Sequence, residues 1–79
     1  MNKIVVKITE TDIFEGRRDD SEACPIALSL KRLFPEDVVC VESWQICING
    51  VAHPTSSFVN DWIDAFDDGC DMEPFTFEL

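Results

Sequence analysis

Apolar and polar residues alternate along both ends of the chain. Between positions 3 and 8, Ile4, Val6 and Ile8 share one face, and lysines stand on the other. The closing segment, 74–79, alternates in the same way. A period of two is typical of a strand with one face buried, so the sequence predicts a strand at each end. Their solvent-facing sides would carry Lys3, Lys7, Thr76 and Glu78.

A helix is predicted between two prolines. Pro25 suits a first helical turn, and Pro35 disfavours a helical residue before it, so the helix should begin near residues 21–24 and stop at Phe34. The preceding segment, 9–16, predicts a short turn or a single helical turn. The buried face of the longer helix would hold Ile26, Ala27, Leu30, Leu33 and Phe34, with Ser29, Lys31 and Arg32 turned away.

A second helix is predicted over residues 55–68. Thr55 or Ser56 can cap its start, and Gly69 suits the left-handed position after its end. At about 100° per residue, apolar side chains occupy one arc and polar ones the remainder. The apolar arc holds Phe58, Val59, Trp62, Ile63, Ala65 and Phe66, and the polar arc holds Asn60, Asp61, Asp64, Asp67 and Asp68.

Residues 38–48 are rich in β-branched and aromatic side chains, which predicts two strands, and Asn49-Gly50 is a strong turn pattern. Two arrangements are open. Either the chain folds back around residues 42–43 and pairs 38–41 with 44–48, or it turns at Asn49-Gly50 into a short strand over 51–53.

The resulting order is strand, helix, strand, strand, helix, strand, in a single domain spanning residues 1–79. Because each terminal strand has one apolar face, we expect an α+β fold with a four-stranded antiparallel sheet and two helices on one face. This β-α-β-β-α-β order fits a ferredoxin-like arrangement.

Charge is distributed unevenly along the chain, whose formal net charge is −10. Residues 1–32 hold six acidic and six basic residues, which cancel. Residues 33–79 hold ten acidic residues and no Lys or Arg. Such a field attracts basic surfaces and repels anionic lipid. We therefore expect a partner protein with a basic surface, and no direct binding of nucleic acid or membrane.

The start of the chain does not resemble a signal peptide, and no segment approaches the roughly 20 apolar residues of a membrane span. We therefore expect a cytoplasmic protein. Its cysteines contain no C-x-x-C spacing, so buried, reduced thiols are expected rather than a zinc site. The calcium-loop pattern is also missing around Gly69, and no metal or other cofactor is predicted. The cysteines are Cys24, Cys40, Cys47 and Cys70.

Catalysis has little support in the sequence. The chain has one histidine, His53, which precedes the hydroxyl residues 55–57, but neighbours in sequence need not be neighbours in space. The three glycines are isolated, so a glycine-rich phosphate loop is missing. We do not expect an enzyme.

The second helix carries the strongest candidate site. Asp61, Asp64 and Asp68 lie three and four residues apart, which stacks them on one helix face. Such a row roughly imitates a file of phosphates, so the protein would compete with nucleic acid for a basic groove. The alternative is that these aspartates have no binding role and only form the solvated outer face of the helix. Asp67 and Asp71 would extend the patch, and the wider field would include Glu36, Asp37, Glu42 and Glu73.

Residues 24–30, 58–69 and 74–79 resemble those of a set of small uncharacterised phage and prophage proteins. The resemblance spans most of the chain and transfers no functional residue. It implies a context similar to that of anti-CRISPR and other anti-defence inhibitors, which act in the cytoplasm of the host cell. The expected target is then a nucleic-acid-binding defence complex, such as a CRISPR effector. The alternative is a homodimeric phage assembly module that uses Leu28 and the exposed sheet face.

Overall fold

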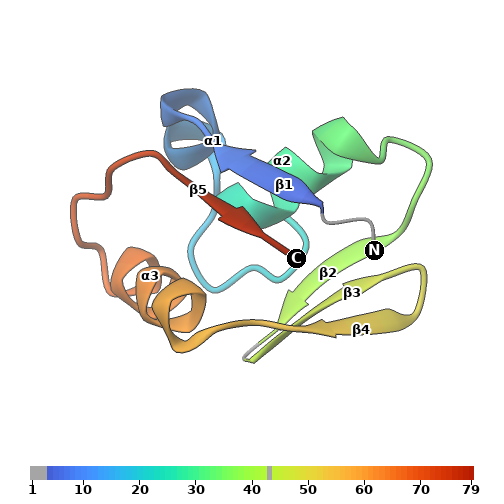
Figure 1. Cartoon of the computed structure of the whole chain (residues 1–79). Helices are drawn as coiled ribbons and strands as arrows, with labels where there is room; N and C mark the ends of the chain where they lie inside the picture. Colours follow the sequence, from blue (N-terminus) through green and yellow to red (C-terminus); the bar gives the residue numbers. More distant parts are fainter. Residues whose placement is uncertain (1–3, 43) are drawn as a thin grey trace.

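The computed structural model describes residues 4–42 and 44–79, and it begins and ends with a strand (Figure 1). In chain order the elements are β1 (Val5–Ile8), α1 (Glu10–Glu15), α2 (Pro25–Leu33), β2 (Val39–Glu42), β3 (Gln45–Ile48), β4 (Val51–Pro54), α3 (Ser57–Asp67) and β5 (Phe75–Glu78). The predicted α+β class is confirmed. Lys3, which was assigned to the first strand, lies outside the described residues.

The strands form two antiparallel sheets. β1 pairs with β5, while β2, β3 and β4 form a three-stranded sheet with β3 in the middle. The predicted four-stranded sheet is therefore wrong, and so are its β-α-β-β-α-β order and the ferredoxin-like arrangement. The middle of the chain supplies three strands instead of two, and the terminal strands pair with each other.

The prediction of two middle strands fails because the two turns that the sequence offered as alternatives are both present. β2 and β3 are joined through positions 43 and 44, of which Ser43 lies outside the described residues. β3 and β4 are joined through Asn49 and Gly50, whose φ angles of 51° and 81° are those of a tight hairpin turn. Two hairpins in succession turn this segment into a meander.

A second reason why the four-stranded sheet is wrong is that the outer edge of β2 is already bonded. The backbone N–H of Val41 donates to the carbonyl of Ser21, at 2.8 Å, in the loop that precedes α2. This bond uses a group that another strand would need for pairing. β1 pairs with β5 instead, and two backbone hydrogen bonds between Ile4 and Leu79 extend that sheet.

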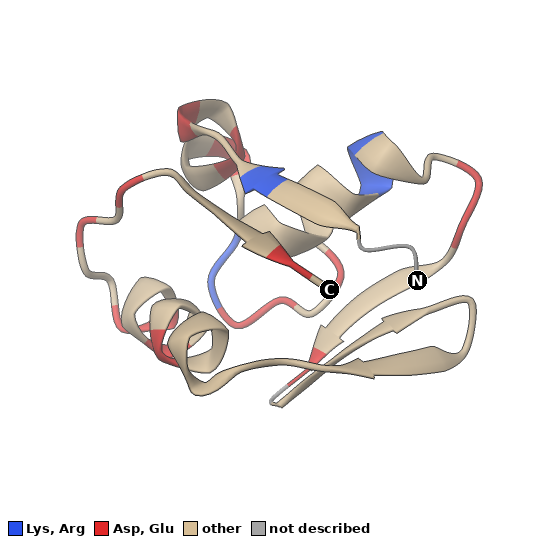
Figure 2. Cartoon of the chain, viewed as in Figure 1, with Lys and Arg blue, Asp and Glu red and all other residues tan. Residues whose placement is uncertain are grey.

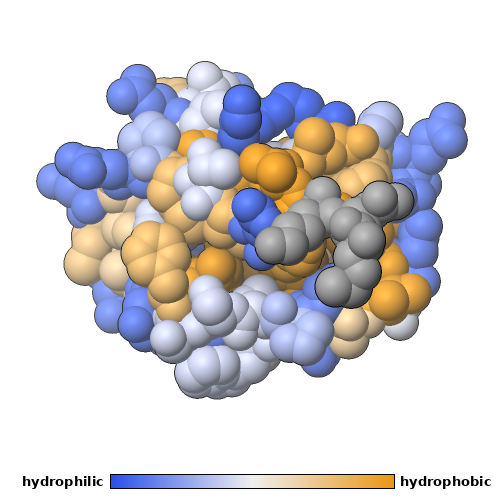
Figure 3. Space-filling model, viewed as in Figure 1, coloured by the Kyte–Doolittle hydropathy of each residue, from blue (hydrophilic) through white to orange (hydrophobic). Residues whose placement is uncertain are grey.

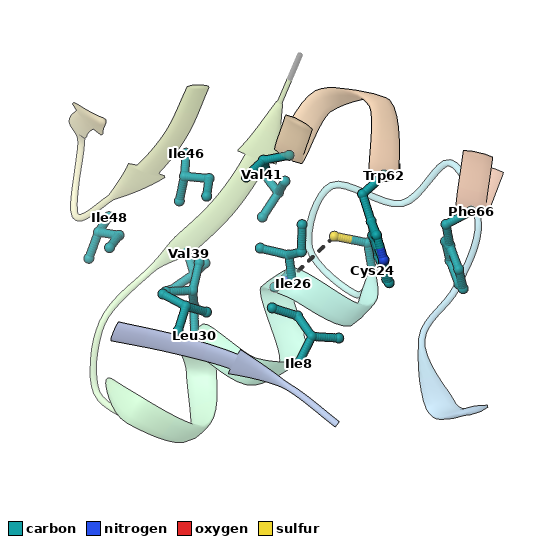
Figure 4. Close-up of a cluster of buried hydrophobic side chains, with 13 residues drawn as sticks. Ile8, Cys24, Ile26, Leu30, Val39, Val41, Ile46, Ile48, Trp62 and Phe66 are labelled. Atoms are coloured by element: carbon teal, nitrogen blue, oxygen red, sulfur yellow. Dashed lines mark hydrogen bonds between the residues drawn. The ribbon is translucent and has the colours of Figure 1, made fainter. Parts of the chain in front are cut away.

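Helix α2 holds the two sheets together, because it contacts both β1 and β2. Its fully buried Ile26 and Leu30 point into a cluster that also receives side chains from both sheets and from α3 (Figure 4). The core consists of Val6, Ile8, Cys24, Ile26, Ala27, Leu30, Val39, Val41, Ile46, Ile48, Val59, Trp62 and Phe66.

The helix boundaries follow the predicted capping residues. Cys24 caps α2, its sulfur accepting a hydrogen bond from the backbone N–H of Ala27, and Pro25 is the first helical residue. Ser56 caps α3, and Gly69 follows that helix at a φ of 88°. The predicted helical turn at 9–16 is α1, which begins with a capping box between Thr9 and Asp12.

The helix faces differ from the prediction at four positions. Ser29 of α2 is fully buried, and its hydroxyl donates to the carbonyl of Ile26 at 2.8 Å, which allows a polar group to lie in the core. Leu33 is instead about half exposed. In α3, Asn60 is buried and Phe58 is exposed, so the apolar arc is displaced from the predicted one.

All four cysteines are free thiols. Cys24 is buried as predicted, and Cys40 and Cys47 are half-buried and face each other across β2 and β3. Cys70 is exposed, so the expectation that every thiol is buried is wrong for this residue.

The surface mixes charged and apolar regions. In the space-filling view, hydrophilic residues form much of the rim, and apolar residues are visible across the middle of the same face (Figure 3). Within the described residues, no helix has the length and apolar character needed to cross a bilayer. The large exposed apolar residues include Phe14, Val38, Trp44, Val51 and Phe58.

Candidate functional site

Three aspartates on the outer face of α3 form the centre of the candidate site. Asp61, Asp64 and Asp68 are all exposed, whereas Val59 and Trp62 of the same helix are buried. Acidic residues colour several positions of the α3 ribbon in Figure 2. The spacing of the three aspartates, three and four residues, places them in a row, as predicted. No Lys or Arg belongs to α3 itself.

Asp67 lies at the edge of this row and connects it to another part of the chain. It is half-buried, and its carboxylate accepts a hydrogen bond from the backbone N–H of Asp19 at 2.9 Å. The loop that carries Asp19 and Asp20 therefore lies against the side of α3. This contact joins residues that are 48 positions apart in the sequence.

A hollow of about 230 Å³ lies between this loop, α3 and the end of β2. Five carboxylates from three separate segments line it, and Cys24, Val41 and Ile63 supply apolar wall. No Lys or Arg belongs to its lining. We call this the acidic hollow; its carboxylates are those of Asp19, Asp20, Glu42, Asp64 and Asp67.

Sequence reasoning missed Asp19 and Asp20, because Arg17 and Arg18 precede them directly. The structure separates the two pairs. Both arginines line a different hollow, together with Phe14 and Phe66. A local count of charges could not reveal this separation, because it depends on the long-range contact with α3.

Arg18 also changes the electrostatics predicted for α3. Its guanidinium lies beside Gly69, with Cζ only 3.5 Å from the position of a Cβ added there. A cation at this end of a helix is favourable, because it faces the negative end of the helix dipole. Residues 33–79 contain no Lys or Arg, so the cation at this end of α3 comes from a distant loop.

A second, smaller hollow adjoins the acidic one. It measures about 50 Å³ and is lined by Trp44, Asn60, Asp61, Ile63 and Asp64. Asp64 borders both hollows, so they form one continuous surface. We call this surface the acidic face; it comprises the acidic hollow together with Trp44, Asp61 and Asp68.

The remaining predicted site residues lie elsewhere. Glu36 and Asp37 are in the loop between α2 and β2, at the opposite end of the molecule from α3 (Figure 2). The carboxylate of Asp37 accepts a hydrogen bond from the side-chain amide of Asn49 at 2.7 Å, so it helps to hold the hairpin. Glu42 is the one residue of the predicted wider field that joins the acidic hollow.

Asp71 and Glu73 border a separate apolar hollow beside α3. It is lined by Phe58, Trp62 and Phe75 in addition to these two acids. The indole N–H of Trp62 donates to the carbonyl of Glu73 at 3.4 Å, which ties this segment to the core. The two acids therefore belong to another side of the helix than the acidic hollow.

A thiol and several carboxylates line the acidic hollow. Burial raises the pKa of the Cys24 thiol in its wall. Backbone hydrogen bonds from Ala27 and Ile26 act against this rise, and the charges of Asp67 and Asp20 add to it. Cys24 is therefore a neutral thiol at neutral pH. Among residues 4–42 and 44–79, no group of three or more His, Cys, Asp or Glu is arranged to hold a metal ion.

The hydroxyl residues next to His53 have structural roles. Thr55 donates its hydroxyl to the side-chain oxygen of Asn60 at 3.1 Å, and Ser56 caps α3. His53 is half-buried on β4, opposite Ile46 of β3.

The chain has no significant match to a protein-family model, to a curated protein or to a solved structure.

Proposed function

We propose that this protein is an inhibitor that binds a basic, nucleic-acid-binding surface of another protein through its acidic face. One observation carries the proposal: carboxylates from three separate segments gather around one hollow, and the lining contains no base. The proposed target is a nucleic-acid-binding complex of a host defence system, with a CRISPR effector as the first candidate. The protein would then be of phage origin and act in the host cytoplasm.

The charge arrangement supports a binding role over a purely solvating one. Like charges at positions i,i+3 and i,i+4 of a helix each cost a few tenths of a kcal/mol. The acidic face adds Asp19, Asp20 and Glu42 to such a row. A basic partner would relieve this repulsion and would be drawn to the face by long-range attraction.

The geometry also resembles a short stretch of nucleic-acid backbone. A helix rises about 1.5 Å per residue, so Asp61, Asp64 and Asp68 follow one another at roughly 4.5 and 6 Å along the axis. Phosphates of a DNA strand follow at roughly 3.4 Å along the duplex axis. The row therefore presents negative charge at a density of the same order as one strand.

The test reverses three charges on the acidic face. A variant with Asp61→Lys, Asp64→Lys and Asp68→Lys should fold, because all three residues are exposed. Positions 64 and 68 also lie at the C-terminal end of α3, where Lys is favourable. It should no longer displace DNA from a purified effector complex in a gel-shift competition. Wild-type displacement should weaken as salt increases.

A matched control changes the net charge by the same amount elsewhere. Glu15→Lys, Glu36→Lys and Glu73→Lys together reverse three exposed acids outside the acidic face. This variant should still displace most of the DNA. If both variants lose DNA displacement equally, the net charge of the protein accounts for binding and the acidic face does not. If both variants keep displacing DNA equally, the proposal is contradicted. If tagged protein recovers only copies of itself, the homodimeric assembly module is the better explanation.

A further inference from the structure

Trp44 is held in solvent at the edge of the acidic face. The residue is 63% exposed, and its φ angle is 69°. A left-handed φ favours Gly or Asn and costs roughly 1–2 kcal/mol for a residue with a bulky side chain. The fold therefore gains little from a tryptophan at this position.

The backbone of Trp44 is nevertheless fixed firmly to α3. Its N–H donates to the side-chain oxygen of the buried Asn60 at 2.7 Å, and its carbonyl accepts from the N–H of Thr55 at 3.0 Å. The amide of Asn60 donates in turn to the carbonyl of Ser56 at 3.0 Å. These bonds attach the hairpin turn to the first turn of the helix that carries Asp61 and Asp64.

The hollow that Trp44 borders is small. The hollow of about 50 Å³ is lined by Trp44, Asn60, Asp61, Ile63 and Asp64. Pockets for drug-sized molecules are several times larger, at roughly 300–1,000 Å³. A hollow of this size suits one planar group at the end of a side chain.

The residues that line this hollow favour a guanidinium over other side-chain groups. An aromatic face attracts a cation, and tryptophan does so most strongly. A guanidinium is planar, so it can stack on the indole while forming two parallel hydrogen bonds with a carboxylate. A lysine ammonium is a compact, strongly hydrated charge, and it gains less from this geometry.

We infer that Trp44, Asp61 and Asp64 receive an arginine side chain of the partner protein, with the guanidinium lying against the indole and hydrogen-bonded to the carboxylates. This inference rests on the proposed function, because it specifies which basic group of the partner the acidic face takes. Trp and Arg are also the residues that most often dominate binding energy at protein interfaces.

The test compares two labelled probe peptides, eight arginines and eight lysines, by fluorescence anisotropy at low ionic strength. The wild type should bind the arginine peptide roughly three- to tenfold more tightly. Trp44→Asn should bring the two affinities close to each other. Asn tolerates a positive φ, so this variant should keep or gain stability, which separates binding from folding.

The control removes another exposed aromatic ring. Phe14 is 89% exposed and lies outside the acidic face, so Phe14→Ala should leave the preference for arginine unchanged. A preference that survives Trp44→Asn overturns the inference and leaves the proposed function standing, because both peptides still bind. Failure of the wild type to bind either peptide overturns both.

Discussion

At the scale of single residues, the pair of Asp12 and Arg32 is the clearest polar contact within the folded chain. Asp12 is only 3% exposed, and the guanidinium of Arg32 donates to both of its carboxylate oxygens, at 2.7 and 3.0 Å. The same guanidinium donates to the carbonyl of Lys7 at 3.2 Å. One arginine of α2 thus fixes both β1 and α1.

From the pair of Asp12 and Arg32 we predict how the free energy of unfolding depends on pH. Burial alone would raise the pKa of Asp12, but hydrogen bonds from Arg32 and Thr9 outweigh it and hold the pKa below the ordinary value of 3.8. A carboxylate with a lowered pKa contributes stability above its unfolded-state pKa and loses it as the pH falls through the folded-state pKa. Asp12→Asn should therefore cost roughly 1–3 kcal/mol at pH 7, because charged hydrogen bonds are lost.

Urea unfolding of the wild type and of Asp12→Asn at neutral and strongly acidic pH tests this prediction. The difference in unfolding free energy should shrink below the pKa of Asp12, where the wild type has also lost the charge. Asp20→Asn is a suitable control, because the hydrogen bonds that its carboxylate accepts from described residues come from the backbone N–H groups of Glu22 and Ala23. A difference that stays constant across this pH range would contradict the role assigned to the ion pair.

At the scale of elements, glycine is required at two positions for different physical reasons. Gly50 has a φ of 81° in the β3–β4 turn, and a Cβ added there would meet no atom within 4 Å. Gly16 has an ordinary φ, but its added Cβ would lie 2.6 Å from the ring of Pro25 and 2.8 Å from the carbonyl of Asp12. Backbone conformation requires the first, and close packing of α1 against α2 requires the second.

Replacing either glycine by alanine should therefore destabilise the protein, and the two effects should differ in whether asparagine reverses them. Gly50→Ala should cost roughly 1–2 kcal/mol, from the left-handed backbone. Gly50→Asn should recover most of this loss, because Asn tolerates that conformation. Gly16→Ala should cost at least as much, through overpacking against a buried proline, and asparagine should not rescue it. Thermal unfolding of the four variants measures this, and rescue by asparagine at both positions would refute the distinction.

The elements differ in how far the sequence could predict them. Both long helices were located by local patterns, with Pro25 and Pro35 at the ends of one and Ser56 and Gly69 at the ends of the other. The turn between β2 and β3 has a weaker pattern than Asn49-Gly50, because Trp44 takes a positive φ although tryptophan is not a typical turn residue. Local patterns therefore located each of the three middle strands but could not show that both turns occur together.

The candidate site was predictable to a similar extent. Asp61, Asp64 and Asp68 follow from helical periodicity alone, and the structure places them together on the exposed side. Asp19 and Trp44 join them through a backbone contact to Asp67 and a hydrogen bond to the buried Asn60. Asn60 was assigned to the polar arc by periodicity. Its burial depends on partners in a turn whose existence the sequence left open.

At the scale of the whole molecule, the net charge of −10 should oppose compaction. Added salt screens this repulsion, so we expect the melting temperature to rise with sodium chloride. A gain of about 1 kcal/mol would raise the melting temperature of a domain this small by roughly 4–8 °C. The reversal of Asp61, Asp64 and Asp68 to lysine should reduce the effect of salt.

Calorimetry over a range of salt concentrations measures this effect. Choline chloride should act like sodium chloride at equal ionic strength, since screening does not depend on which cation is present. A melting temperature that does not change with either salt would show that the acidic residues lie too far apart to repel one another in the folded state.

Because the first strand pairs with the last, the two sheets should form at different stages of folding. The entropy lost in closing a loop grows with the number of residues in it. The strands of the β2–β3–β4 meander are neighbours in the sequence, whereas the β1–β5 register joins Val5 to Glu78 across nearly the whole chain. The meander can arise from consecutive residues alone. The two-stranded sheet depends on prior collapse around α2, which makes the terminal strands the latest part of the fold to assemble.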